Sequence, residues 1–145
     1  MPSPTSAACS RKLKLLKRSK RLFSRLLLTL EARIMRVHGR SMTPGLHPND
    51  LILVQQGGFA VRPPRRGDLI AITPDVLGGR AIVKRIIGVP QETLTVEGRR
   101  WQLSENEFFV VGDRTEGSLD SRILGPASRQ EMIGPVLARL WPIFR

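Results

Sequence analysis

The sequence predicts a mostly β fold, a single domain that follows a basic N-terminal helix. From residue 36 onward, short apolar runs of strand length alternate with clusters of Gly, Pro, Asn and Asp. No helix-sized segments separate these runs, as they would in a protein built from βαβ units. The chain has 145 residues, which suits one domain with one core.

The N-terminal segment differs from the rest of the chain. Residues 1–10 are small, polar and interrupted by proline, so we expect them to be disordered. Residues 11–35 repeat apolar residues at helical spacing, which predicts a basic amphipathic helix with an apolar face of Leu16, Phe23, Leu27, Leu30 and Ile34. The apolar run at 26–30 is much shorter than the about 20 residues of a membrane span. We therefore expect no transmembrane segment and no secretory signal.

Charge is concentrated in the N-terminal arm. Residues 1–40 hold 11 Lys/Arg against one acid, a net +10, whereas residues 41–145 hold 13 against 11, a net +2. This distribution predicts an anionic partner for the arm. The helix either lies on an anionic membrane surface or packs its apolar face on the domain or a partner. One cysteine, Cys9, excludes an internal disulfide, and with only two histidines we expect no metal and no cofactor.

Seven apolar runs have strand length, and most are bounded by turn residues. They are Leu51–Val54, Leu69–Ile72, Ala81–Ile87, Thr93–Val96, Trp101–Leu103, Phe108–Val111 and Ile133–Leu140. Glu97-Gly98 predicts the tip of the hairpin that joins the fourth run to the fifth. These strands define a predicted β domain of residues 36–145.

A candidate nucleophile lies at the start of this domain. Ser41 follows Gly39 by two residues and precedes Pro44 by three, which predicts a turn. A turn serine can present its hydroxyl, and nearby backbone N–H groups can point at a substrate oxygen. Because serines are common in surface turns, a catalytic interpretation also needs a base, a group that orients the base, and a groove.

Three residues are candidates for the base. His38 and His47 are close to the serine in sequence, but a Ser-His-Asp arrangement is recognised from its geometry. Lys84 shares one face of its predicted strand with Ile82 and Ile86. Burial on that face would lower the pKa of the amine, whereas the alternative is that the side chain extends to solvent.

A polar turn follows the predicted strand at 108–111. It carries Ser118, Asp120 and Arg122. Asp120 and Arg122 could form a charge-assisted pair that fixes the loop, and Ser118 could then hydrogen-bond a lysine amine and aim it. The alternative is a surface loop whose ion pairs contribute little.

Four segments occur in an order that is typical of one enzyme family. They are Ser41-Met42-x-Pro44, Gly67-Asp68-Leu69-Ile70, the run from Lys84 to Pro90, and Gly112-Asp113 followed by Ser118-x-Asp120-Ser121-Arg122-x-x-Gly125. In these segments the chain resembles the type I signal peptidases, the Ser/Lys serine endopeptidases of peptidase family S26, over about residues 36–140. The resemblance implies coiled, mainly antiparallel β-sheets, as in signal peptidases and repressor proteases.

The resemblance also implies a role for each matching residue. Ser41 matches the nucleophile, Lys84 the general base and Ser118 the hydroxyl that orients the lysine. Asp120 and Arg122 match the salt-bridged pair that supports the site. Family members cleave precursor proteins after small residues and bind the substrate as an added β-strand. A precursor protein is therefore the expected partner.

The oxyanion hole and the membrane anchor are where the chain departs from the family. The resemblance implies that the Ser41 N–H is one oxyanion donor and that Met42 helps to line the groove. Gly39 stands where many members have a serine that completes the oxyanion hole. As a short member that we expect to lack an anchor, the chain resembles the maturation proteases of nickel-type superoxide dismutases, which trim a cytoplasmic precursor. We thus expect a cytoplasmic protein, with peripheral membrane contact through residues 11–35 left open.

Two other hypotheses fit parts of the sequence. A self-cleaving repressor-type Ser/Lys protein would bind DNA through the arm. The arm offers one helix rather than a helix-turn-helix, and no Ala-Gly cleavage pair lies between it and the domain, so we expect no nucleic-acid partner. The other hypothesis is a non-enzymatic β-domain module that the arm tethers to a membrane or to nucleic acid. The oligomeric state is not predicted.

Overall fold

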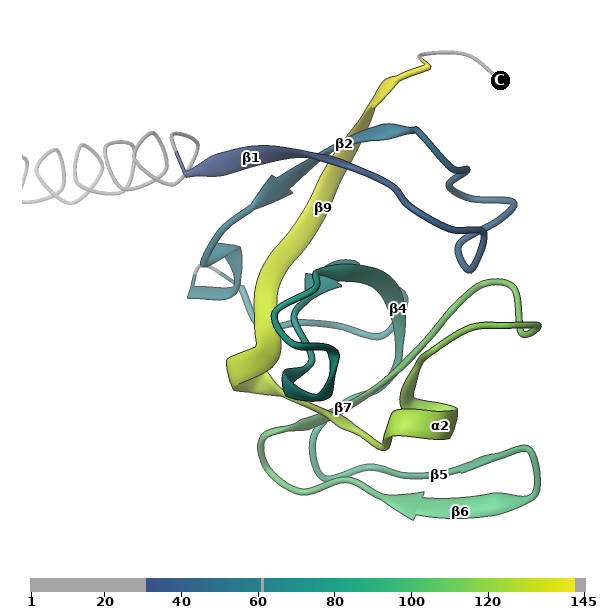
Figure 1. The fold of residues 1–145 in the computed structure, drawn as a ribbon. Helices are drawn as coiled ribbons and strands as arrows, with labels where there is room; N and C mark the ends of the chain where they lie inside the picture. The colour runs from purple at the N-terminus through teal and green to yellow at the C-terminus, as the bar shows by residue number, and fades with distance from the viewer. Residues whose placement is uncertain (1–30, 61, 143–145) are drawn as a thin grey trace, which may run out of the picture. The chain divides into compact units, whose positions relative to one another are not determined.

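The described part of the chain is a mostly β unit (Figure 1). A computed structural model describes residues 31–60 and 62–142. The strands are β1 (Ala32–Arg36), β2 (Leu51–Gln55), β3 (Leu69–Ile72), β4 (Ile82–Gly88), β5 (Thr93–Val96), β6 (Arg99–Gln102), β7 (Glu107–Val111), β8 (Ala127–Ser128) and β9 (Met132–Trp141). The short helical elements are η1 (Gly58–Ala60), η2 (Asp75–Leu77), α2 (Ser121–Leu124) and η3 (Arg129–Glu131).

Seven of these strands form one curled antiparallel sheet. Their order is β1-β2-β9-β3-β4-β7-β8, and β5 and β6 form a separate hairpin. This arrangement confirms the predicted mostly β class with mainly antiparallel pairing. The long strand β9 pairs with β3 through its first residues and with β2 through its later ones. A Cβ at Gly134 of β9 would overlap the carbonyl of Gln55, so glycine permits the close approach of β9 and the end of β2.

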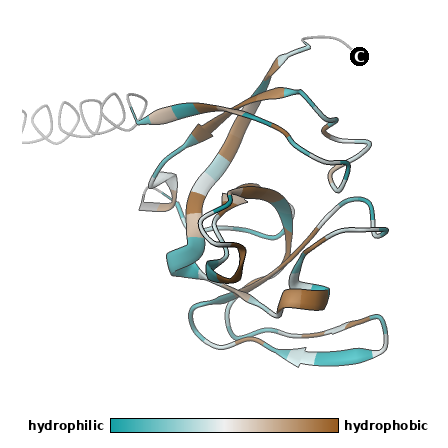
Figure 2. Cartoon of the chain, in the orientation of Figure 1, coloured by the Kyte–Doolittle hydropathy of each residue, from teal (hydrophilic) through white to brown (hydrophobic). Residues whose placement is uncertain are grey.

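Two apolar clusters hold the sheet together. One contains Phe59, Ile70, Ile72, Ile86, Phe108, Val110 and Ala127, and the other contains Val37, Met42, Leu46, Ile52, Val54 and Ala71. Strand β3 contributes to both, because successive side chains point to opposite faces of a strand. The hairpin of β5 and β6 contributes to neither, and Figure 2 shows hydrophilic residues along β6.

The predicted strands agree well with the structure. All seven occur, and each end lies within two residues of the predicted one. The hairpin turn at Glu97-Gly98 joins β5 to β6 as expected. Strands β1 and β8 and the helix α2 were not predicted from the sequence.

The predicted helix at 11–35 is wrong at its C-terminal end. Residues Ala32–Arg36 are strand β1, which pairs with β2 from Ala32 opposite Gln55 to Arg36 opposite Leu51. Ladder hydrogen bonds and side-chain contacts with β2 outweigh the helical spacing there. Ile34, assigned to the apolar face of the helix, is 64% exposed on β1.

The domain therefore begins earlier than the predicted residue 36. The chain divides into the units Met1–Glu31 and Ala32–Arg145. The disorder predicted for residues 1–10 and the helix predicted for residues 11–30 lie outside the described residues. Among the residues that are described, no helix is long and apolar enough to cross a membrane.

Candidate active site

Ser41 lies in a turn whose following residues, Met42 and Leu46, are buried in the core. Two backbone hydrogen bonds close the turn, from Thr43 N–H to the Arg40 carbonyl at 3.1 Å and from Leu46 N–H to the Met42 carbonyl at 2.7 Å. Met42 is only 2% exposed and Leu46 4%, so burial of these two side chains anchors the turn. Ser41 itself remains half-buried at the edge of a groove.

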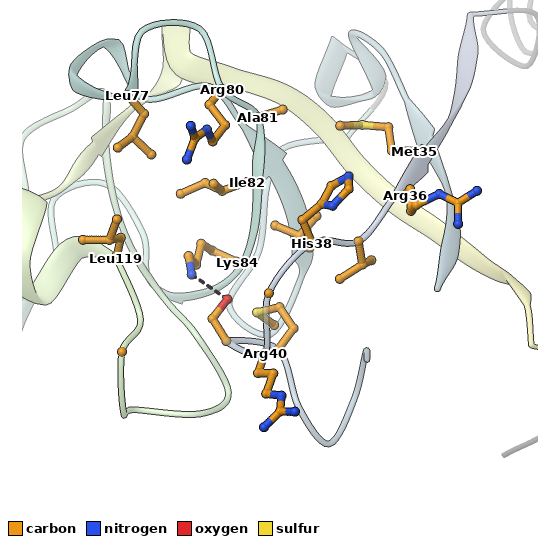
Figure 3. A pocket seen from close by; sticks show the side chains of 16 residues that line it. Met35, Arg36, His38, Arg40, Leu77, Arg80, Ala81, Ile82, Lys84 and Leu119 are labelled. Carbon is orange, nitrogen blue, oxygen red and sulfur yellow. Dashed lines mark hydrogen bonds between the residues drawn. The ribbon is translucent and has the colours of Figure 1, made fainter. Parts of the chain in front are cut away.

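Strand β4 places Lys84 directly beside this serine. Lys84 is only 3% exposed, and it alternates with the half-buried Ile82 and the fully buried Ile86 along one face of the strand. Its Nζ lies 2.9 Å from Ser41 Oγ (Figure 3) and 3.1 Å from Ser118 Oγ. The structure thus brings Lys84 together with two serines that are 43 and 34 positions away from it in sequence.

The surroundings of Lys84 favour its neutral form. Burial is the largest influence and lowers the pKa of the amine from its ordinary value of 10.5. The negative charge of Asp120 opposes this effect, and the positive charge of Arg122 adds to it. The net result is a lowered pKa, so that more of the amine is unprotonated near neutral pH than in an exposed lysine.

Asp120 organises the loop that carries Ser118. Its Oδ2 accepts hydrogen bonds from Ser118 Oγ at 2.5 Å, from the Gly112 N–H at 2.8 Å and from Arg122 Nη2 at 2.6 Å. Burial alone would raise the pKa of this carboxyl, but the hydrogen bonds from Arg122, Gly112 and Ser118 outweigh it and hold the pKa below its usual range. Asp120 also caps α2 by accepting from the Arg122 N–H at 3.2 Å.

This network fixes the direction of the hydrogen bonds at Lys84. A hydroxyl has one hydrogen and two lone pairs. Ser118 gives its hydrogen to the ionised Asp120, so it can only accept from Lys84. One N–H of the amine is thereby turned toward Ser118, and a neutral amine can direct its lone pair at the hydroxyl of Ser41.

A second ion pair lies under the Ser41 turn and was not identified as a support from the sequence. Arg85 binds Asp113 through two hydrogen bonds of 2.7 and 2.8 Å. The next residue, Arg114, donates its N–H to the carbonyl of Ser41 at 2.9 Å. Gly45 leaves room for this pair, because a Cβ there would lie 3.0 Å from an Asp113 oxygen. The only sequence signal was position, since Arg85 adjoins Lys84 and Asp113 follows Gly112.

The groove beside Ser41 has a volume of about 600 Å³. Its walls come from residues 35–42, which run from the end of β1 through the serine turn, from Leu77 and residues 80–84, and from Gly117 and Leu119 (Figure 3). Two strand edges border it. β1 is an edge strand, and β7 pairs with β4 only from Arg85 onward. Within the described residues, the edge of β4 before Arg85 therefore has no strand partner on that side.

Gly39 and Met42 also line the groove. The side chain that contacts Ser41 Oγ is Lys84, not one of the two candidate histidines. Gly39 has φ +80°, and nothing lies within 4 Å of where its Cβ would be. Among the described residues no acceptor is found for the Ser41 N–H. His38 lines the groove, whereas His47 lies in the following turn; in the described part of the chain neither is a hydrogen-bond partner of Ser41.

Comparison with known proteins decides the family. The model of the family described as "Signal peptidase, peptidase S26" matches residues 21–103 and 91–141. The chain belongs to the peptidase S26 family. Membership classes it as a serine endopeptidase, and the four segments recognised in the sequence all lie within the matched residues.

Relatives include bacterial and mitochondrial enzymes. The chain is 33% identical to "Signal peptidase I" of Leptolyngbya laminosa, over 81% of this chain and 72% of the relative. It is 26% identical to "Probable signal peptidase I-2" of Synechocystis, over 81% of this chain and 66% of the relative. It is 31% identical to "Mitochondrial ATP-independent inner membrane protease subunit 1b" of Arabidopsis thaliana, over 72% of this chain and 68% of the relative.

Proposed function

We propose that this peptidase removes an N-terminal leader or signal-type extension from a precursor protein, with Ser41 as nucleophile and Lys84 as general base. The observation that carries the proposal is the distance of 2.9 Å between Ser41 Oγ and the buried Nζ of Lys84. A serine hydroxyl is a weak nucleophile unless an adjacent base takes its proton. Burial of the amine supplies such a base.

The proposed reaction follows the hydrogen bonds of the site. Ser41 Oγ attacks the scissile carbonyl carbon while its proton moves to Nζ of Lys84. The carbonyl oxygen becomes negative and is stabilised by the Ser41 N–H. The protonated lysine then gives its proton to the leaving amine, the C–N bond breaks, and an acyl-enzyme remains. Water, deprotonated by the same lysine, hydrolyses this ester and restores Ser41.

Ser118, Asp120 and Arg122 act in this proposal as positioning residues. Ser118 holds one N–H of the amine, and Asp120 fixes the direction of the Ser118 hydroxyl. Arg122 keeps Asp120 ionised through hydrogen bonds of 2.6 and 3.0 Å. None of the three exchanges a proton with the substrate. Their effect is to keep the lysine lone pair aimed at the nucleophile.

The groove suits a substrate bound as an added strand. The edges of β1 and of residues 82–84 can supply backbone hydrogen bonds to an extended peptide. Met42 and Gly39 lie close to the nucleophile on one wall, with Ile82 on the other. Substrate side chains next to the scissile bond would therefore contact a mostly apolar lining. Such a lining suits the small residues that the family resemblance implies.

Cleavage of a purified precursor tests the proposal. The substrate should carry a small-x-small site, and its products should be identified by mass spectrometry. Ser41→Ala and Lys84→Ala should each lower the rate by at least about 10³, since the nucleophile and base act as one unit. Arg100→Glu in the exposed hairpin strand β6 is a matched control that should cut at the parental rate. Cleavage by Ser41→Ala at that rate would rule out the mechanism.

For the physiological substrate, we propose the precursor of a nickel-type superoxide dismutase as the first to test. The support is the subgroup resemblance of the sequence. Incubation of that precursor with the protein should release its N-terminal extension at one site. If a generic leader is cut and this precursor is not, the peptidase assignment stands and the subgroup assignment fails.

For its location, we propose that the basic arm brings the protein to an anionic membrane surface. The support is the net charge of +10 on residues 1–40. Co-sedimentation of the full chain with vesicles should be stronger for anionic than for neutral lipid and should weaken as salt is raised. Equal binding to both vesicle types would contradict the membrane role.

A further inference from the structure

The groove lining holds three arginines that the proposed reaction does not use, Arg36, Arg40 and Arg80, and Arg80 is the one that adjoins β4. Arg80 immediately precedes Ala81 and β4, and in Figure 3 its guanidinium points into the groove between Leu77 and Ile82. The groove lining contains no Asp or Glu. Within the described residues, no carboxylate lies at ion-pair distance from Arg80. The positive charge of Arg80 is therefore available to a substrate.

The position of Arg80 relative to Lys84 sets the substrate residue that it can contact. Ile82 and Lys84 share one face of β4, Arg80 lies two residues before the start of the strand, and Figure 3 shows the three side chains one above another on the same side of the groove. An extended chain rises about 3.3 Å per residue, so the backbone of Arg80 lies at most about 13 Å from that of Lys84. A substrate strand laid along this edge rises by the same amount, so the substrate residue facing Arg80 is about four positions from the one facing Lys84.

We propose that Arg80 is a specificity-determining residue that selects precursors with an acidic side chain about four residues from the scissile bond. This inference rests on the proposed peptidase function, because it takes the register from a substrate strand aligned with Lys84. The planar guanidinium can bind a carboxylate through two parallel hydrogen bonds. The apolar side chains of Leu77 and Ile82 beside it reduce the access of water to such a pair.

The expected preference is moderate. An ion pair that remains partly open to solvent changes a binding equilibrium by about fivefold at most, so a peptide with Glu at the selected position should exceed its Gln counterpart by up to about fivefold in kcat/KM. Lys at the same position should be disfavoured by a similar factor through repulsion. The preference should shrink as salt is raised from 0.01 to 0.5 M, because salt screens charges at this distance.

A positional scan with a charge swap tests the proposal. One peptide with a small-x-small site is made with Gln, Glu or Lys at each position from six before to six after the scissile bond. The parent should show a Glu-over-Lys preference that peaks at one position about four residues from the bond. Arg80→Glu should invert this preference at that position alone. Arg100→Glu, an equal charge change in β6, should leave it unaltered.

Ratios of kcat/KM within one enzyme do not depend on the fraction that is correctly folded. A flat scan in the parent, or the same ratio in Arg80→Glu, would overturn the inference while leaving the peptidase function intact. The proposed function would be overturned instead if the parent did not cut the Gln peptides, or if Ser41→Ala cut them as fast as the parent. If Arg80→Glu left the scan unchanged but weakened binding to anionic vesicles, the arginine would contact lipid, and the inference would be wrong.

Discussion

Replacing Ser118 with alanine should lower kcat, because it removes the group that aims the Lys84 amine. The Ser118 hydroxyl accepts from Nζ at 3.1 Å and donates to Asp120 at 2.5 Å. Without it, the contact between Nζ and Ser41 Oγ is the amine's remaining hydrogen bond within the described residues. The amine can then rotate, and its lone pair no longer faces the serine in most molecules.

The size of the effect follows from the hydrogen bond that is lost. A hydrogen bond to a charged group contributes about 1.5–3 kcal/mol. Lys84 becomes charged as it takes the serine proton, so most of this contribution belongs to the transition state. At 1.36 kcal/mol per factor of ten, kcat should fall by about 10- to 150-fold. The free energy of unfolding should also fall, by about 1–3 kcal/mol, since buried polar groups lose a partner.

The assay is steady-state cleavage of a leader peptide across a pH series, with urea unfolding measured in parallel. Ser118→Thr keeps a hydroxyl and should recover much of the lost kcat, whereas Ser104→Ala at an exposed position should not change it. A Ser118→Ala protein that is folded and keeps both the parental kcat and the parental pH profile would refute the positioning role. The lysine would then be oriented by other contacts.

Three further predictions concern Lys84, Gly39 and Gly112. The value of kcat/KM should rise with pH toward a plateau, with a midpoint below 10.5, because burial lowers the pKa of Lys84 and the base must be neutral. Between the lowered pKa of Lys84 in the folded protein and its ordinary pKa in the unfolded chain, the unfolded chain binds more protons. The free energy of unfolding should therefore rise with pH in that window, and Lys84→Met should lose this rise. If the hydroxyl of Gly39→Ser supplies a second oxyanion donor, the kcat of this variant should exceed that of Gly39→Ala by about tenfold or more. Both variants share the strain of φ +80°, so the comparison isolates the hydroxyl. Equal rates would exclude this donor. Gly112→Ala should lose both activity and about 1–3 kcal/mol of stability in urea unfolding, because its Cβ would meet Ser118 Oγ and lie 2.6 Å from the Ser41 carbonyl oxygen; a stable, active variant would contradict that packing.

The strands could be predicted because their signals are local. Apolar runs bounded by turn residues predicted β3 and β5 to the residue, and alternation predicted that Lys84 shares a face with Ile82 and Ile86. Strand β1 could not be found in this way. Its Ile34 fits a helical repeat as well as a strand, and only pairing with β2, across an intervening turn, decides between them.

The candidate site likewise contains residues that the sequence could predict and residues whose contacts depend on the fold. Ser41, Lys84 and the Ser118 loop could be predicted as site residues because their segments match a family pattern in order. The Arg85–Asp113 pair was not assigned a role, since its contact with the Ser41 turn depends on how β4 and β7 lie beside each other. That Arg80 has no ion-pair partner within the described residues is likewise a property of the folded groove and not of its sequence neighbours.

In the proposed mechanism, Arg122 acts on the reaction through two intervening residues, Asp120 and Ser118. Burial favours a protonated Asp120, and the hydrogen bonds from Arg122 are the strongest influence against this. A protonated Asp120 would no longer need the hydrogen of Ser118. That hydroxyl could then donate to the lone pair of Lys84 and compete with Ser41 for the base. The ion pair therefore does more than fix a loop: it makes Ser118 an acceptor, and only an acceptor leaves the base free for the nucleophile.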